Sequence, residues 1–520
     1  MPVTAPKAAR HLEVERKFDV VESTVSPSFE GIAAVGRVDQ KPSQAMDAVY
    51  FDTEAQDLAR NRITLRRRTG GADAGWHLKL PAGPDSRTEI HAALTASDGA
   101  SAGEVPAELL DVVLAIVRDR PVVPVARITT QRESQLLYSA DGAALAEFCD
   151  DHVTAWSAGG PNGSDSEPLE QQWREWEVEL IAPNGADGSE LLDRLTNRLL
   201  DAGAAPAGHG SKLARTLGAT PQDANRPPVD PVHRAVARHV EELLVWDRAV
   251  RANADDSVHQ MRVTTRKIRS LVKDSQVPFT LTDKAWLLDE LRELAGVLGV
   301  ARDAEVLGER YQHALDGLDP ALLRGPVRER LVGGALRRYR SGLRRSLTAM
   351  RSKRYFRLLD ALDAMVSEFP VIGSGQKSER VPPTNIDAAY RGIQKAAKAA
   401  KAARRGADEG TDPADVVNPN EALHRIRKRA KRLRYTASAI GATRVSEQAK
   451  AIQTLLGDHQ DSVVSREHLL AQADAARDAG EDTFTYGLLY QQESDLAAEC
   501  RQQLDGALRK LHSSVRKARR

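Results

Sequence analysis

The chain has few cysteines and no long apolar run. Its 520 residues include two cysteines, Cys149 and Cys500, which lie far apart in unlike contexts. A disulfide framework or a zinc site is therefore not expected, and a reducing cytoplasm fits this composition. The first ten residues lack the apolar segment of a secretory signal, and no apolar stretch reaches membrane-spanning length. We expect a cytoplasmic protein that does not bind a membrane.

Two motifs of nucleotide and ester chemistry are missing as well. The sequence has no Walker phosphate-binding loop, which disfavours an ordinary P-loop ATPase. It also has no Gly-x-Ser-x-Gly element, so a serine nucleophile of that kind is not expected. Charged side chains are left as the main candidates for function.

Charge is balanced overall but segregated along the chain. The 74 Lys and Arg residues face 73 Asp and Glu residues, which gives a formal net charge of +1. Residues 259–273 and 424–435 nevertheless contain no Asp or Glu and many Arg and Lys. This local excess of positive charge indicates a polyanionic partner.

The first 218 residues have the pattern of a β-rich domain. We predict helices at 106–118 and 189–202 and strands at 12–20, 46–52, 63–68, 75–80, 87–91, 125–137, 144–150 and 173–181. A turn is expected at residues 183–185. About eight antiparallel strands with polar inward faces predict a closed β-tunnel with flanking helices, because closure removes exposed sheet edges.

A second, helical domain follows a Pro-rich polar linker. The predicted limits are 1–218 for the tunnel domain, 219–231 for the linker and 232–515 for the helical domain. A break at 371–385 divides the helical domain into halves of about 232–370 and 386–515. Each half contains a His-x-x-Arg helix and then a Leu-Gly-x-x-x-Asp element. We therefore predict a multidomain α+β chain whose all-α part is a duplicated pair of four-helix bundles.

The strand at 12–20 places charged side chains on one face. Glu13, Glu15 and Lys17 are two residues apart, whereas Leu12 and Val14 point to the other side. Carboxylates are hard ligands for Mg²⁺ or Mn²⁺, and a lysine suits a phosphate oxygen. The alternative is an edge strand with alternating surface charge.

Four other predicted strands also alternate charged with other residues, and together their charged residues are of both signs. The alternating positions carry Arg66 and Arg68, Lys79, Arg87 and Glu89, and Glu177 and Glu179. A tunnel interior with both signs is costly to dehydrate unless its charges are paired or ligand-bound. A polyphosphate bound with a divalent metal would satisfy both signs. Structural salt bridges are the alternative.

These motifs resemble those of the CYTH, or triphosphate tunnel metalloenzyme, family. The resemblance covers roughly residues 9–218 and rests on Glu-x-Glu-x-Lys, 65–68, 76–81 and Glu-Val-Glu at 177–179. It implies an eight-stranded antiparallel tunnel that binds triphosphate compounds with Mg²⁺ or Mn²⁺. The reaction implied is attack of water on a terminal phosphoryl group, aided by metal and positioning.

The resemblance also implies roles for individual residues. Catalytic roles fall to Glu13, Glu15 and Lys17. Triphosphate binding falls to Arg66, Arg68, Lys79 and Arg87, with Arg127, Arg132 and Lys212 as weaker candidates. Metal binding falls to Glu13, Glu15, Glu147, Asp150, Glu177 and Glu179.

Each half of the helical domain contains one basic stripe. At helical spacing, one stripe comprises His259, Arg262, Arg266 and Arg269, and the other comprises His424, Arg427, Lys431 and Arg434. Like charges at this spacing repel by roughly 0.2–0.5 kcal/mol a pair, so a duplicated stripe indicates a bound anion. The alternatives are a solvated helix face and metal binding by the two histidines. Asp303 and Asp461 are expected to cap helices or to pair with arginines.

Residues 232–515 resemble the CHAD domain, the conserved-histidine α-helical domain. The match rests on both His-x-x-Arg helices and both Leu-Gly-x-x-x-Asp elements, and it implies binding of inorganic polyphosphate. In the first copy, Thr265 replaces a larger apolar residue of the helix seam.

The leading hypothesis is a metal-dependent hydrolase of inorganic triphosphate or another triphosphate, with a polyphosphate-binding module. The alternatives are a non-catalytic polyphosphate scaffold and an adenylate cyclase or thiamine triphosphatase. Nucleic-acid binding is disfavoured because aromatic residues are sparse along the stripes. Association with polyphosphate granules follows from the resemblance. Oligomeric state stays open.

Overall fold

The structure is a computed structural model of the chain. It describes residues 9–83, 85–94, 104–157, 169–181, 186–218, 231–274, 281–367, 386–408, 419–439 and 441–518. The predicted turn at 183–185, the break at 371–385 and all of the predicted linker except Pro231 lie outside these residues. The chain divides into two compact units, Met1–Leu298 with Arg345–Phe369, and Gly299–Arg344 with Pro370–Arg520.

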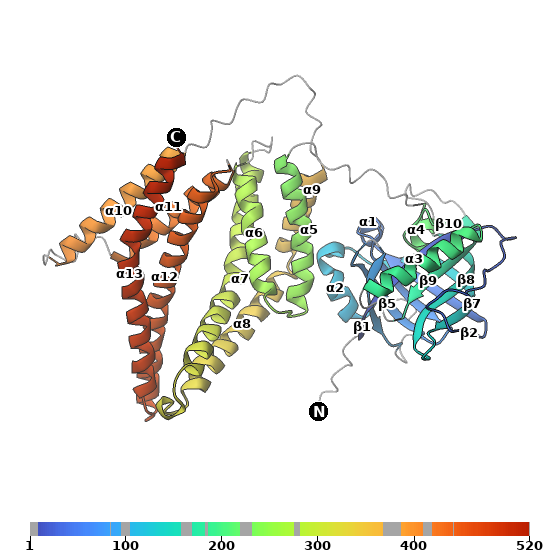
Figure 1. Ribbon diagram of the computed structural model, residues 1–520, viewed down its shortest axis with the longest axis horizontal. Helices are drawn as coiled ribbons and strands as arrows, with labels where there is room; N and C mark the ends of the chain where they lie inside the picture. The colour runs from blue at the N-terminus through green and yellow to red at the C-terminus, as the bar shows by residue number, and fades with distance from the viewer. Residues whose placement is uncertain are drawn as a thin grey trace, which may run out of the picture. The chain divides into compact units, whose positions relative to one another are not determined.

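A closed antiparallel sheet forms the N-terminal part of the chain (Figure 1). Its strands are β1 (Ala9–Val20), β3 (Gln44–Asp52), β4 (Thr64–Thr69), β5 (Gly75–Pro81), β6 (Ser86–Ala92), β7 (Val123–Tyr138), β8 (Ala144–Ser157) and β9 (Leu169–Leu180). They follow the order β1-β6-β5-β4-β3-β7-β8-β9, and pairing of β9 with β1 closes the ring. Two short strands, β2 (Arg37–Gln40) and β10 (Ala205–Pro206), extend β7 and β1. The predicted eight-stranded tunnel is confirmed.

Helices cover part of the outer face of the ring. Side chains of α2 (Ala107–Val117) and α1 (Asp57–Arg60) pack against the apolar outward residues of β4, β5 and β6. Side chains of α3 (Ala186–Asp201) pack against those of β1, β8 and β9, including Phe18, Phe148 and Trp176. These two apolar layers fix the phase of the strands, because a residue beside an outward apolar residue must point into the tunnel.

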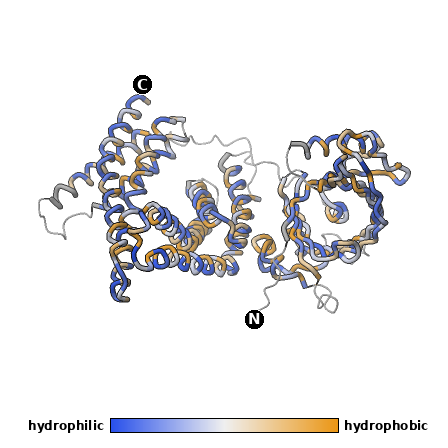
Figure 2. The backbone as a smooth tube through the Cα atoms, turned by 60° about the horizontal axis from the view of Figure 1, so that its bottom comes forward, coloured by the Kyte–Doolittle hydropathy of each residue, from blue (hydrophilic) through white to orange (hydrophobic). Residues whose placement is uncertain are grey.

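The short helix α4 (Lys212–Thr216) lies inside the ring, which Figure 2 shows from one open end. Leu213 is 1% exposed and packs with Ala48, Tyr50, Ala126 and other inward residues of β3, β7 and β8. Ser211 caps this helix by accepting a hydrogen bond from the backbone amide of Ala214. One wall of the interior is therefore apolar and covered by α4, and charged side chains line the rest of the interior.

The rest of the described chain is helical. The first set contains α5 (Pro231–Arg251), α6 (Ser257–Asp274), α7 (Leu281–Asp316), α8 (Gly334–Ala349) and α9 (Lys353–Ser367). The second contains α10 (Ile386–Asp408), α11 (Pro419–Ala439), α12 (Thr443–Asp478) and α13 (Phe484–Ala518). Both α7 and α12 have 36 residues. In chain order, α7 is followed by two α-helices, α8 and α9, whereas α12 is followed by the single helix α13. This order agrees with the predicted duplication.

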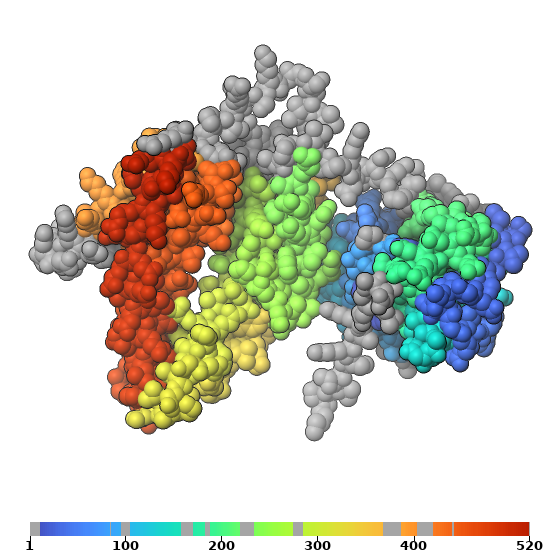
Figure 3. All heavy atoms as spheres, viewed as in Figure 1, coloured from blue at the N-terminus to red at the C-terminus, as the bar shows by residue number. Residues whose placement is uncertain are grey.

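The apolar seams of the basic helices are buried as predicted. In α6 the buried seam includes Val258, Met261, Ile268 and Val272, and Thr265 joins it by donating a hydrogen bond to the Met261 carbonyl. In the second set, α10 to α13 share one apolar core, and α12 and α13 lie side by side (Figure 3). None of the described helices combines the length and apolar character that a membrane crossing requires.

Candidate functional site

The inward face of β1 carries the first acidic and basic residues of the tunnel. Glu13 is 5% exposed, and its carboxylate lies 2.7 Å from the ammonium group of Lys79 on β5. The Glu15 carboxylate lies 2.8 Å from Lys17 Nζ and 3.9 Å from Arg87 Nε on β6. Lys17 also pairs with Glu177 on β9. Four strands therefore contribute to one charged group around β1.

Two arginines of β4 extend this charged wall. Arg66 donates a hydrogen bond to the hydroxyl group of Tyr50 at 3.3 Å. Arg68 is buried and pairs with Asp73 in the turn between β4 and β5. Burial, together with the positive charges of Arg66 and Arg132, lowers the pKa of Arg68 to about 9. An anion bound here would relieve the repulsion between these guanidinium groups.

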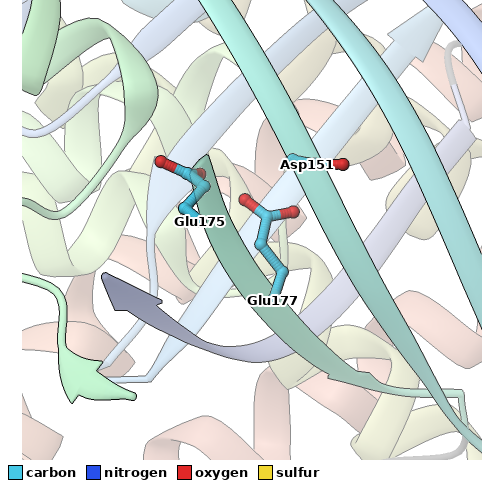
Figure 4. A group of neighbouring side chains, drawn as sticks. All are labelled: Asp151, Glu175 and Glu177. Carbon is cyan, nitrogen blue, oxygen red and sulfur yellow. The ribbon is translucent and has the colours of Figure 1, made fainter. Parts of the chain in front are cut away.

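A second acidic group lies at the boundary between β8 and β9. Carboxylate oxygens of Asp151, Glu175 and Glu177 lie within 4.8 Å of one another (Figure 4). The ammonium group of Lys212 on α4 lies 2.8 Å from Asp151, 2.7 Å from Glu175 and 2.7 Å from Glu177. Arg132 donates hydrogen bonds to Asp151 and Glu177. The protein's own cations thus occupy a position that could otherwise hold a metal.

The pKa values separate the two acidic groups. At Glu177, burial opposes ionisation, but the charges of Lys17, Lys212 and Arg132 outweigh it and hold the pKa well below its usual value. Burial raises the pKa of Glu13 to about 7 despite Lys79. Burial and the nearby charge of Glu15 likewise raise the pKa of Glu179, although Lys79 opposes them. Glu13 and Glu179 are therefore less well compensated by nearby cations than Glu177 is.

Three carboxylates form a row across neighbouring strands. The β-sheet register places Glu147 opposite Glu179 and Glu179 opposite Glu15. Burial opposes the ionisation of Glu15, but Lys17 and Lys79 outweigh it and lower its pKa to about 2. Glu147 is 3.1 Å from Lys41 Nζ. Like charges directly opposite one another destabilise a sheet, and a divalent cation would relieve this row.

Two of the predicted tunnel residues lie elsewhere. Asp150 is on the outer face of β8, where Arg174 binds its carboxylate and Ser26 donates a hydrogen bond to it. The prediction of Asp150 as a metal ligand is therefore wrong, because the alternation of β8 places Asp150 on the outer face and Asp151 on the inner face. Arg127 is also on the outer face, paired with Asp47 at 2.6 Å and 60% exposed at its side chain. Because its side chain is on the outer face of β7, Arg127 does not contribute to the charged interior.

Sequence reasoning left out several inward residues. The sequence pattern does not single out Asp151, Glu175 or His77 for the site, and it makes Arg132 only a weak candidate. The signal for Asp151 was present, because Ala146 and Phe148 belong to the apolar outer face and so place Glu147 and Asp151 inward. The Lys212 contacts depend on α4, whose five residues are too few for a periodic pattern.

The stripe on α6 lies beside α7. Arg262 and Arg269 donate Nε hydrogen bonds to the carbonyl groups of Ala295 and Leu288 at 3.3 and 3.2 Å. His259 is half-buried and Arg266 is exposed. The two carbonyl contacts orient the guanidinium groups of this stripe along the surface of α6.

The stripe on α11 contacts α12. A Cβ atom at Gly457 would lie 3.3 Å from the Arg427 guanidinium group, so glycine lets this arginine lie close to the helix. Burial raises the pKa of Asp461, although the charges of Arg427 and Arg310 oppose it. Asp303 and Asp461 lie within the long helices α7 and α12, so the helix-capping interpretation is wrong.

The remaining α11 residues complete this stripe. Arg434 donates a hydrogen bond to Gln453 at 3.3 Å, and the Lys431 ammonium group lies 5.8 Å from the ring centre of Tyr435. Burial, followed by the charges of Lys428 and Arg427, lowers the pKa of His424. Burial and the neighbouring cations therefore both oppose the charged form of this imidazole.

Family models match both parts of the chain. The model described as the CYTH domain matches residues 11–204, and the model described as the CHAD domain matches residues 234–470. The proteins Rv2226 and MT2285 from two strains of Mycobacterium tuberculosis are 70% identical to this chain over 526 residues. Each comparison covers 100% of both proteins.

Solved structures resemble each part at lower identity. The CHAD domain from the plant Ricinus communis is 23% identical, with a TM-score of 0.36, and the match covers 54% of this chain and 90% of that domain. HpAC1 from Hippeastrum, reported to have a dominant triphosphatase activity, is 16% identical with a TM-score of 0.24. That match covers 39% of this chain and 94% of HpAC1.

Proposed function

Because the chain belongs to the proteins in which a CYTH domain precedes a CHAD domain, we propose that its tunnel hydrolyses a triphosphate, most simply inorganic triphosphate. The observation that carries this proposal is the meeting of Glu13, Glu15 and Lys17 with cations of β5 and β6 and carboxylates of β9 inside a closed sheet. A chain of phosphoryl groups needs such cations, and its metal counter-ion needs such carboxylates.

In this proposal the carboxylates near β1 hold the divalent metal. Glu15, Glu179 and Glu147 form the like-charge row, and Glu13 lies on the same strand as Glu15. Their oxygen donors suit Mg²⁺ or Mn²⁺, which when bound would neutralise phosphate charge and favour attack by water. The acidic group around Lys212 is a poorer candidate because an ammonium group already neutralises it.

The cationic side chains of the tunnel have a binding role in this proposal. Lys17, Arg66, Arg68, Lys79 and Arg87 hold phosphate oxygens and neutralise the charge that develops on the leaving pyrophosphate. A water oxygen attacks the terminal phosphorus, the bridging P–O bond breaks, and a tunnel carboxylate accepts the proton. Glu13 suits the last step because its pKa, about 7, lies near neutrality.

The helical part supplies a second binding surface in this proposal. The stripe of His259, Arg262, Arg266 and Arg269 on α6 and that of His424, Arg427, Lys431 and Arg434 on α11 would each bind inorganic polyphosphate. Support comes from the CHAD match and from arginines whose orientation is set by contacts with α7 and α12.

The tunnel is tested by replacing Glu13 or Glu15 with alanine in the full chain. Metal-dependent phosphate release from triphosphate should fall by roughly a hundredfold or more, because the site loses a group that acts on the developing charge. Circular dichroism should show that folding persists. Glu190→Ala on the exposed side of α3 is the matched control, since its side chain is 65% exposed.

The substrate is tested with triphosphate, long-chain polyphosphate, ATP and thiamine triphosphate in parallel. Preferential release of phosphate from triphosphate supports the proposal. Cyclic AMP from ATP would instead identify a cyclase, and tight triphosphate binding with no phosphate release would identify a scaffold. Full turnover by the Glu13 and Glu15 variants would reject the assigned residues.

A further inference from the structure

Helix α2 carries charged residues that the proposed reaction does not use. Its apolar face packs against β4, β5 and β6 of the tunnel. Asp111 lies on the helix, and Arg118 comes directly after its last residue, Val117. Both contact residues of the first helical set, and α2 lies against α5 of that set within the first compact unit. The same helix therefore has partners in the tunnel and among the helices.

Arg118 places its guanidinium group between two carboxylates of α9. Nη1 donates a hydrogen bond to Asp360, and Nη2 donates one to Asp363. The two aspartates are three residues apart, a spacing at which helix side chains are neighbours and like charges repel. The Arg118 side chain is 5% exposed, so its charge is largely removed from water. Arg118 thus compensates the repulsion within α9, and the aspartates compensate the burial of Arg118.

Asp111 makes the opposite arrangement. Its Oδ1 atom lies 3.2 Å from Arg251 Nη1 on α5 and 2.8 Å from Arg351 Nη2 between α8 and α9. Arg251 also donates to Asp247 at 2.6 Å and to the Met350 carbonyl at 2.9 Å, and its side chain is 2% exposed. The guanidinium group that receives Asp111 is therefore fixed by residues of the helices themselves.

The two contacts have opposite polarity, since α2 supplies an acid to a pair of bases and a base to a pair of acids. Such a reciprocal pattern specifies one orientation of two surfaces. We propose that Asp111 and Arg118 form a docking surface through which α5 and α9 join the tunnel in one cooperatively folding unit. This docking surface takes no part in the proposed reaction.

The backbone at Arg118 agrees with a position that tertiary contacts determine. Its φ angle is 60°, in a region that residues other than glycine seldom adopt. Such a conformation is unfavourable by itself and persists where the surrounding structure fixes it. The Arg118 amide donates to the Leu114 carbonyl at 2.8 Å and so ends α2 at this point. The chain thus holds an unfavourable backbone at the residue that binds both aspartates.

The test is hydrogen exchange of the full chain, followed by mass spectrometry without any ligand. Val178→Ala removes two methyl groups from a fully buried position on β9, in the apolar layer that does not include α2. Exchange of the slowest amides in the tunnel strands should accelerate roughly tenfold or more. The slowest amides of α5 and α9 should accelerate equally, because a single opening exposes every amide of one cooperative unit.

Asp360→Ala with Asp363→Ala is the uncoupling change, because it leaves the buried Arg118 guanidinium group without these two acceptors. In that background Val178→Ala should accelerate the tunnel strands and leave α5 and α9 unchanged. Adding Arg118→Ala should recover part of the lost protection, since removing both partners of a buried contact costs less than removing one. Unrelated structural effects would add instead. Glu108→Ala, at an exposed position of α2, is the control and should change nothing.

Each outcome decides the proposal. Acceleration by Val178→Ala that is confined to the tunnel strands in the otherwise wild-type chain overturns the single unit. Equal acceleration of α5 and α9 that persists without Asp360 and Asp363 overturns the role of the docking surface. If Val178→Ala does not fold, exchange of wild type in rising urea replaces it, with one common slope expected and different slopes contradicting the proposal. Absence of phosphate release by wild type contradicts the hydrolase proposal and leaves this comparison intact.

Discussion

Lys212 is the residue on which the second acidic group depends. Its ammonium group contacts Asp151, Glu175 and Glu177 at 2.7–2.8 Å, and its side chain is 9% exposed. Burial opposes its charge, but the three carboxylates outweigh burial and raise its pKa well above the usual value. Removing one partner of a buried ion pair leaves uncompensated charge in a medium that solvates it poorly.

Lys212→Ala should lower the free energy of unfolding by roughly 3 kcal/mol in EDTA. The three carboxylate groups would then lie close together with one cation fewer, so Mg²⁺ or Mn²⁺ should recover part of this loss by binding there. Urea unfolding with and without the metal measures both effects. Lys41→Ala, at a 36% exposed side chain, is the control and should lose less than about 1 kcal/mol. A variant with wild-type stability would contradict this account.

Neighbouring residues also show how far sequence can predict the site. Alternation along β1, β4, β5, β6 and β9 is enough to place Glu13, Arg66 and Lys79 inward, because each strand has an unambiguous apolar face. In β8, two adjacent aspartates made the phase ambiguous, and Asp150 was chosen although Asp151 faces the interior. Contacts such as His77 with Asp73 depend on turn geometry that alternation does not encode.

At the scale of elements, the two long helices α7 and α12 meet through a polar contact. The Tyr311 hydroxyl group and His468 Nδ1 are hydrogen-bonded at 2.9 Å, and the two rings are stacked 5.6 Å apart. Burial, followed by the charge of Arg338, lowers the pKa of His468 to about 4. The folded state therefore favours the neutral form of the His468 imidazole over its protonated form.

The stability of these helices should fall as pH falls from about 6.5 to 4. In this window the unfolded chain binds a proton at His468 that the folded chain does not bind, so unfolding is favoured by about 2 kcal/mol after allowance for partial exposure. His468→Gln cannot titrate and should show a flatter dependence. Thermal unfolding of both proteins at pH 7, 5.5 and 4.5 measures the difference, and parallel curves would contradict the assignment.

Element prediction succeeded where patterns were long. The eight ring strands and the helices α2 and α3 follow from alternation or helical spacing, and their observed limits differ from the predictions mainly at the ends. The four-residue strand β2, the two-residue strand β10 and the five-residue helix α4 were not predicted, since each is shorter than the period needed to recognise it. In β8 the strand continues to Ser157, beyond the predicted end, because polar and apolar residues alternate past the two aspartates.

At the scale of the whole molecule, a net charge of +1 conceals two differently charged environments. The tunnel buries both signs in contact with each other, whereas the helices α6 and α11 present mainly positive stripes. We therefore expect the two proposed activities to be separable by mutation.

Arg427→Glu with Arg434→Glu should weaken binding of long-chain polyphosphate by roughly tenfold or more and reduce its salt dependence, because fewer counter-ions are released. Phosphate release from triphosphate should stay unchanged, and Glu15→Ala should give the opposite pattern. Arg425→Glu with Arg432→Glu makes the same charge change on another face of α11 and serves as the control. Calorimetry at two salt concentrations and a phosphate assay check the prediction, and equal losses in both pairs would indicate non-specific charge.

Closure of the ring by β1 and β9 has a consequence for biosynthesis. The two strands, which pair Glu15 with Glu179, are separated by about 150 residues of chain, which a ribosome needs roughly 8 to 30 s to translate. During that interval one edge of β1 is unpaired and available to any other extended chain. The nascent polypeptide thus exposes an aggregation-prone strand edge until β9 has been synthesised and pairs with it. The enclosed interior of the sheet forms only after that step.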